Sequence, residues 1–243
     1  MIDVRYKFLL LGGMILCCWQ WADAQDKIPS EQLYEAFAAR YMDSVSNRTT
    51  IFYGKLQEPL WMITSNNPYF KDARYTKSKI RYGGSLYTDI PLRWDLYRDE
   101  LVVLSPDNYN VVLSPDKTED ATFHGYHIRY LKKDSLSNSP PPGYYLLLHA
   151  GPCTVLVKHT AVMQQKSYNQ RIENYFMFAT KYYIKKENVY FPVKNKNTLL
   201  NALGDYHQEL SRLIRANRFT FKRDAEAMIV TTVKEYEKMK YHP

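Results

Sequence analysis

The sequence predicts an α+β fold: an antiparallel β-meander sheet, or a partial barrel, with one N-terminal and two C-terminal helices packed on it. Short apolar or alternating segments bounded by turn residues recur from residue 49 to residue 193, and this regular spacing is typical of antiparallel strands. Apolar residues at three- and four-residue steps predict helices at about 30–46 and 197–240. Nothing in the sequence resembles a linker between these regions, so residues 25–243 are expected to form one domain.

Residues 1–24 are expected to be a signal peptide that is cleaved before Gln25. Arg5 and Lys7 form a basic start, twelve uncharged residues follow from Phe8 to Trp19, and Ala22-Asp23-Ala24 supplies the small-x-small pattern of a cleavage site. A membrane-spanning helix needs about 20 apolar residues, more than this stretch contains. We therefore expect a periplasmic or extracellular protein, free or peripherally associated with the outer membrane, with no transmembrane segment after cleavage.

Charge and cysteine content limit the expected partners. The chain carries a net charge of +8 with both signs interspersed, which indicates a solvated basic surface rather than a nucleic-acid partner. Cys153 is the one cysteine after the expected cleavage site, so stability has to come from the core rather than from disulfides. A chain of this length buries roughly 70% of its unfolded surface, which is enough for one large domain.

The elements are expected in the following order. The first helix has an apolar stripe that begins at Leu33, and Thr50-Ile51-Phe52-Tyr53 opens the first strand. Gly83-Gly84 predicts a turn. From Pro91 to Tyr97 apolar and polar residues alternate, as in a half-buried strand. The alternation predicts that Leu92, Trp94 and Leu96 face the core, whereas Arg93, Asp95 and Tyr97 face away from it.

A short repeat and a series of strands follow. Val102–Asp107 recurs letter for letter as Val111–Asp116, and two apolar runs closed by Ser-Pro-Asp turns fit a meander better than a solenoid. Residues 135–143 include three consecutive prolines and predict an exposed loop. Further strands are expected at Phe123–Leu131, Tyr144–His149, Thr154–His159, Thr180–Lys185 and Val189–Val193. Two helices close the chain, one from Thr198 to about Asn217 and one that begins at Asp224, its expected N-cap.

The candidate catalytic and metal-binding groups fit ordinary structural roles. His124 and His127 would point to opposite faces if they lie in one extended strand, so they are not expected to share a metal ion. Asp95 and Asp99 would lie about 13 Å apart along a strand, too far for a glycosidase-type pair. Cys153 with His149 or His159 could form a nucleophile and base, but a lone cysteine before an apolar strand is typical of a core residue. No catalytic, cofactor-binding or metal-binding residue is therefore predicted.

Tyrosine content and a basic stretch are the remaining features. The chain has 22 tyrosines, and we interpret most of them as core residues of half-buried strands rather than as a binding platform, which stays the alternative. The basic stretch is interpreted as a solvated helix face; its members are Arg212, Arg215, Arg218, Lys222 and Arg223.

Five segments, in this order between the signal peptide and the terminal helices, resemble an uncharacterised family of proteins secreted by Gram-negative bacteria. They are Asn67-Pro68-Tyr69-Phe70, Gly84-Ser85-Leu86-Tyr87, Pro91–Tyr97 running into Glu100-Leu101-Val102-Val103, Pro142-Gly143-Tyr144-Tyr145, and Lys181–Lys186. The resemblance covers most of the chain after residue 24. It implies export and a single domain, and it implies no activity because the family has none assigned.

Export, an aromatic sheet and the lack of a catalytic motif favour a non-enzymatic binding or scaffold module of the periplasm or cell envelope. Its partner is not identified by the sequence; an envelope protein or polymer is the expected class. One alternative is a hydrolase that acts on envelope or extracellular polymers through dispersed Asp, His and Tyr side chains. The other is a carrier of an apolar ligand. A polar cleft with a converging acid and base would favour the hydrolase, and a large apolar cavity would favour the carrier.

Overall fold

The computed structural model describes residues 37, 50–133, 138–168 and 171–241, without the side chains of Tyr168 and Arg171. The expected signal peptide and almost all of the expected helix at 30–46 lie outside the described residues. The strands and helices reported below all belong to one compact unit, residues 48–243.

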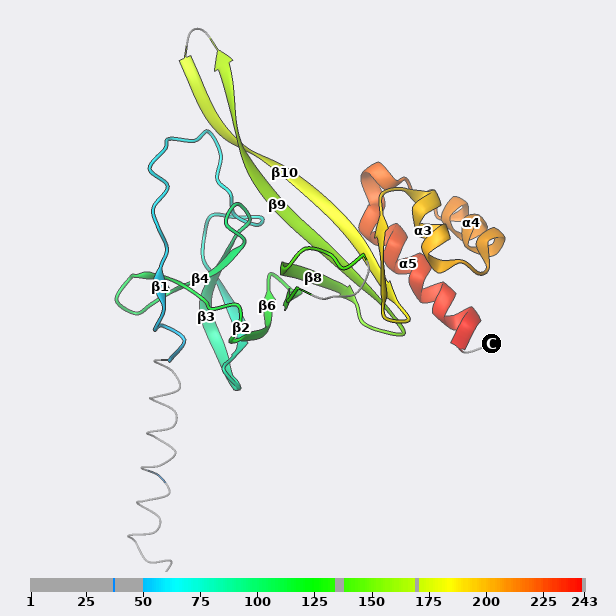
Figure 1. The fold of residues 1–243 in the computed structure, drawn as a ribbon, viewed down its shortest axis with the longest axis horizontal. Coiled ribbons are helices and arrows are strands. Elements are labelled where there is room, and N and C mark those ends of the chain that lie inside the picture. The colour runs from blue at the N-terminus through cyan, green and yellow to red at the C-terminus, as the bar shows by residue number, and fades with distance from the viewer. Residues whose placement is uncertain (1–36, 38–49, 134–137, 169–170, 242–243) are drawn as a thin grey trace, which may run out of the picture. The chain divides into compact units, whose positions relative to one another are not determined.

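The described strands form one open antiparallel sheet, which confirms the predicted fold class (Figure 1). Its order is β1-β5-β4-β3-β2-β6-β7-β8-β9-β10-β11, so most neighbours in the chain are also neighbours in the sheet. The strands are β1 (Lys55–Leu56), β2 (Thr76–Tyr82), β3 (Ser85–Asp95), β4 (Glu100–Leu104), β5 (Asn110–Val112), β6 (Thr118–Phe123), β7 (Tyr126–Leu131), β8 (Gly143–His149), β9 (Cys153–Tyr168), β10 (Arg171–Lys186) and β11 (Val189–Val193). The two copies of the repeat lie in β4 and β5, which pair with each other as the meander prediction requires.

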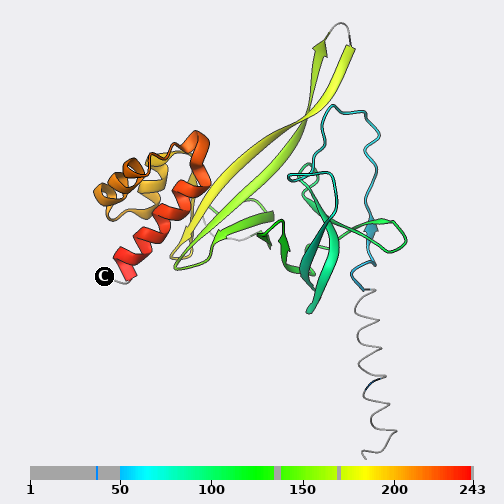
Figure 2. The ribbon, with the colours of Figure 1, turned by 180° about the vertical axis from the view of Figure 1, so that it is seen from behind.

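Three helices pack on the end of the sheet that contains β8 to β11 (Figure 2). They are α3 (Lys196–Leu203), α4 (His207–Ala216) and α5 (Phe221–Tyr241). The prediction of one helix from Thr198 to Asn217 is wrong, because the chain turns at Gly204, where φ is +83°. The last helix spans Phe221–Tyr241, but its backbone is non-helical at Asp224, where φ is −122° and ψ is 28°, so the helix restarts after Asp224, near the start that the sequence predicts. The Asp224 carboxylate accepts the Thr220 N–H.

Two strand predictions also need correction. Residues 50–53 form a turn rather than a strand, with Ile51 buried. The expected single strand Phe123–Leu131 is a hairpin, because His124 and Gly125 form the turn between β6 and β7. In contrast, the turn expected at Gly83-Gly84 lies where the sequence predicts it.

The prediction of which side chains of residues 91–97 face the core is correct for the three apolar residues. It is wrong for two of the three residues that were expected to face solvent. Leu92, Trp94 and Leu96 are buried, and Tyr97 is exposed. Asp95 is fully buried instead of facing solvent, because its Oδ1 accepts the N–H groups of Tyr97 and Arg98 and closes the turn after β3. Arg93 is half-buried beneath the segment before β2.

The longest strands are β9 and β10, sixteen residues each. β8 pairs with β9 at residues 155–157, and β11 pairs with β10 at residues 182–186. Beyond these contacts the two strands continue as a hairpin, which Figure 1 shows extending away from β8 and β11. We call residues 162–168 and 171–178 the arm.

Candidate functional site

Residues 57–75, between β1 and β2, form an ordered segment whose only strand-like contacts are two isolated bridges, at Thr64 and Tyr69. Long segments without helix or strand are uncommon in compact domains and often carry function. Polar contacts hold this segment along its length, among them those of Gln57, Arg93 and Asn66, which makes it the first candidate for a binding site.

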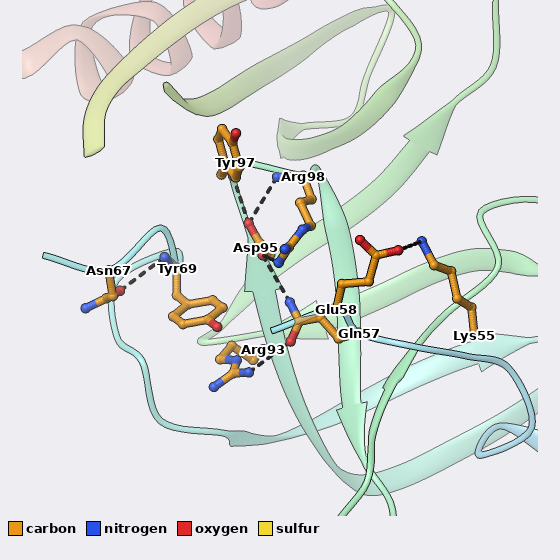
Figure 3. Close-up of polar contacts among 9 residues, drawn as sticks. All are labelled: Lys55, Gln57, Glu58, Asn67, Tyr69, Arg93, Asp95, Tyr97 and Arg98. Atoms are coloured by element: carbon orange, nitrogen blue, oxygen red, sulfur yellow. Dashed lines mark hydrogen bonds and ion pairs between the residues drawn. The ribbon is translucent and has the colours of Figure 1, made fainter. Parts of the chain in front are cut away.

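The first contact is at the start of the segment, where Gln57 lies between Arg93 and Asp95 of β3 (Figure 3). Gln57 Nε2 donates to Asp95 Oδ2 at 3.0 Å, and Arg93 donates to Gln57 Oε1 at 3.1 Å. The Arg98 guanidinium lies 3.5 Å from the same Asp95 oxygen. The buried Asp95 carboxylate thus has partners on both sides and holds the start of the segment against β3.

The second contact is the Arg93 guanidinium, which packs between two tyrosine rings further along the segment. It lies 3.9 Å from the ring centre of Tyr69 and 4.5 Å from that of Tyr75. It also donates to the Ala73 carbonyl at 3.2 Å. Burial raises the pKa of both tyrosines although the guanidinium opposes this. Stacking and hydrogen bonds together fix the C-terminal part of the segment on β3.

The third contact joins the middle of the segment to the arm. Asn66 Nδ2 donates to the Phe176 carbonyl at 2.9 Å, and the Phe176 N–H donates to Asn66 Oδ1 at 2.7 Å. The Ser65 N–H donates to the Asn174 carbonyl at 2.9 Å. The segment therefore lies along the outer edge of β10 as a short added strand.

Between these contacts the segment exposes large apolar side chains. Trp61 is 89% exposed and Ile63 is 93% exposed, with Met62 beside them. On the arm, Ile172 is 72% exposed and Phe178 is 50% exposed. Both lie on the face of β10 that also carries Asn174, whose Nδ2 donates to the Ile63 carbonyl at 3.4 Å. We call Trp61, Met62, Ile63, Ile172 and Phe178 the apolar surface.

Carboxylates also gather near a cleft of about 420 Å³ beside β4. Its lining includes Asp99, Glu100 and Tyr144. Burial raises the pKa of Glu100. Asp99 Oδ2 accepts from the buried Lys158 ammonium and from the Tyr144 N–H. Asp95 and Asp99 thus have different hydrogen-bond partners.

The two candidate metal histidines lie at an open hollow of about 600 Å³ around the β6–β7 turn. His124 contacts the Thr76 hydroxyl at 3.2 Å, and His127 contacts the Thr122 hydroxyl at 3.4 Å. The argument that both lie in one extended strand is wrong, because His124 is in the turn. Within the part of the chain that the structure describes, no three His, Cys, Asp or Glu side chains are grouped to hold a metal ion.

Cys153 and the histidines near it do not form a nucleophile and base. His149 Nε2 lies 2.8 Å from Glu237 of α5, and the Cys153 N–H donates to the same carboxylate at 2.7 Å. The thiol is fully buried, and burial raises its pKa to about 11, so it stays protonated at neutral pH. His159 lies elsewhere, against Phe70, and burial lowers its pKa to about 4. Glu237 joins helix and sheet, a role that no sequence spacing suggested.

Tyrosines lie both in the core and on the surface, where Tyr53, Tyr97 and Tyr109 are exposed, whereas the basic stretch is solvent-exposed as predicted. Several tyrosines are buried in the core, namely Tyr82, Tyr87, Tyr144, Tyr145, Tyr183, Tyr190 and Tyr236. The five basic residues from Arg212 to Arg223 are exposed, and Arg223 pairs with Asp224.

None of the helices in the described ranges is long and apolar enough to cross a membrane. Comparisons of the chain with protein-family models, curated proteins and solved structures find no match.

The contact between Asn66 and the arm can be tested directly. Asn66→Ala is expected to increase amide hydrogen exchange across residues 60–68, because two hydrogen bonds of about 1 kcal/mol each are lost. Asn67→Ala is the matched control, since Asn67 Oδ1 accepts only the nearby Tyr69 N–H. Mass spectrometry of the exchanged peptides measures both variants. Equal protection in Asn66→Ala and the parent would show that Asn66 does not hold the segment.

Proposed function

We propose that this chain is an exported, non-enzymatic binding or scaffold module of the periplasm or cell envelope, and that an envelope protein docks on the apolar surface. The observation that carries the proposal is the exposure of Trp61 and Ile63 in a segment held by polar contacts on both sides. Large exposed apolar side chains lower solubility unless a partner covers them. Their ordered presentation reduces the entropy that a partner must remove on binding.

The partner expected from this chemistry has an apolar pocket with a polar rim. Tryptophan is enriched among the residues that dominate binding energy, and such residues fill fully desolvated pockets. The polar groups around the surface are already paired in the chain, as in the Asn66 contacts, so apolar burial is the main contribution left for a partner.

The proposal is tested in cells of the native host by a photo-crosslinking amino acid at position 62. We expect one discrete adduct in the envelope fraction, and we expect at least about a tenfold loss of that adduct when Trp61→Ala and Ile63→Ala are added. Lys222, an exposed residue of α5, is the control position and should not give the same adduct. An adduct that persists in the double variant would contradict docking on the apolar surface.

A hydrolase acting on envelope or extracellular polymers is the second candidate. The observation that favours it is the raised pKa of Glu100, beside Asp99 in the cleft, because a carboxyl group with a raised pKa can act as a general acid. Hydrolysis of a peptidoglycan or polysaccharide probe that is lost in Glu100→Gln would replace the first proposal. A carrier is less well supported, since charged residues line the described cleft.

A further inference from the structure

The outer edge of β9 carries backbone N–H and carbonyl groups whose direction follows from the hydrogen bonds of Phe176 and Ala161. The N–H and the carbonyl of Phe176 both form hydrogen bonds with the Asn66 side chain, so both groups point away from β9. In an antiparallel ladder the residue opposite, Met163, must then point its own N–H and carbonyl away from β10. The Ala161 N–H, two residues earlier, obeys the same rule and donates to the Leu96 carbonyl at 3.0 Å.

The alternation extends along the arm to Gln165 and Ser167. These residues pair with Asn174 and Ile172, and the Asn174 carbonyl is again directed outward, to Ser65. Met163, Gln165 and Ser167 therefore direct their backbone groups to the outer side of β9. β8 ends its pairing at Val157 on this side, and no other described residue forms a backbone ladder with residues 163–167.

The two edges of the arm differ. The β10 edge is covered by the chain's own residues 64–66, whereas the β9 edge from Met163 to Ser167 is open among the described residues. Open strand edges form sheets with other strands. The occupant has to be a strand that pairs with three outward-directed residues.

We propose that a second copy of this chain adds its own β9 to this edge, antiparallel and centred on Gln165. In this register Gln165 lies opposite Gln165 of the second copy, and Met163 lies opposite Ser167 of the second copy. Each outward-directed residue therefore forms a hydrogen-bonded pair. In a register centred on Gln164, Ser167 would lie opposite Ala161 of the second copy. The Ala161 N–H already donates to the Leu96 carbonyl, so Ser167 could not form a full hydrogen-bonded pair there.

The positive charge of Lys166 favours the same register. Centring on Lys166 would place two lysines directly opposite each other, which is unfavourable in an antiparallel pair. Centring on Gln165 places Lys166 opposite Gln164 of the second copy, while each Lys166 keeps its ion pair with Glu173 at 2.8 Å. The edge is thus self-complementary in both hydrogen bonding and charge. The proposal concerns the backbone of β9 and is independent of docking on the apolar surface.

A proline at position 165 tests the pairing. Gln165→Pro removes an N–H that points outward, so the β9–β10 ladder keeps its hydrogen bonds. Light scattering after gel filtration, over a range of concentrations, should show a dimer for the parent and for Gln165→Ala. Gln165→Pro should raise the dissociation constant at least about tenfold, because both copies lose a donor at the centre of the pair. A parent that is monomeric throughout, or a proline variant that dimerises equally well, would refute the proposal.

Cysteine variants test the register and do not depend on proline being tolerated. Gln165→Cys should form an intermolecular disulfide under mild oxidation, because facing residues of a hydrogen-bonded pair have Cα atoms about 5.5 Å apart. Ser167→Cys should not, because the two cysteines would be offset by about 13 Å along the strands. The native Cys153 is buried and does not compete. Efficient crosslinking of Ser167→Cys without that of Gln165→Cys would overturn the register.

Discussion

Trp94→Ala is expected to lower the free energy of unfolding by about 3–5 kcal/mol, as large-to-small changes at buried aromatics typically do. Trp94 is 0% exposed, and its ring centre lies 5.3 Å from that of Phe70. It also contacts the half-buried ring of His159 from β9. The indole therefore joins β3 to the segment before β2 and to the long hairpin, and its removal leaves a cavity where three parts of the fold meet. Denaturant unfolding followed by circular dichroism measures the loss.

Leu86→Ala is the control for this prediction. Leu86 lies on the same strand but is 59% exposed, so its replacement should change the free energy of unfolding by no more than about 0.5 kcal/mol. Arg93, although adjacent to Trp94, cannot serve as a neutral control because it packs between Tyr69 and Tyr75. Equal losses in Trp94→Ala and Leu86→Ala would show that the indole is not central to the core.

The parts of the fold that were predicted from the sequence are those in which side-chain type and local geometry agree. Alternation of apolar and polar residues located Leu92 and Trp94 on the core side, and Gly83-Gly84 marked a turn. The arm was missed because its outer half is exposed, so residues such as Gln164 and Lys166 show no buried face. Its strands were therefore predicted at less than half their length.

The candidate site was less accessible to sequence reasoning, because it depends on contacts between distant residues. Asn66 binds the backbone of Phe176, which is 110 residues away. No pattern in either segment indicates that contact. The burial of Asp95 was mispredicted for a related reason: alternation specifies a face of the strand, but at the end of β3 hydrogen bonds from the turn make a buried carboxylate favourable.

Gly143→Ala is the other change with a large expected effect. Gly143 has a φ of +144°, and a Cβ at this position would overlap both Asp99 Oδ2 and Lys158 Nζ. Lys158 is 5% exposed, and it also donates to the Tyr144 carbonyl at 3.1 Å. Burial lowers the pKa of Lys158, and the Asp99 carboxylate opposes that shift because it favours the charged ammonium. An alanine that separates the two groups leaves this charge without its partner.

Breaking a buried ion pair typically costs about 3–5 kcal/mol, and we expect Gly143→Ala to fall in or near that range. The unfavourable φ contributes in addition, so a second glycine is needed to separate backbone strain from the loss of the ion pair. Gly83 has a φ of +58° and nothing within 4 Å of its added Cβ, so Gly83→Ala should cost only about 1 kcal/mol. Thermal and denaturant unfolding of both variants measure the difference. Because Lys158 lies on β9 and Asp99 in the turn before β4, similar small losses in the two variants would mean that this ion pair does not hold the two parts of the sheet together.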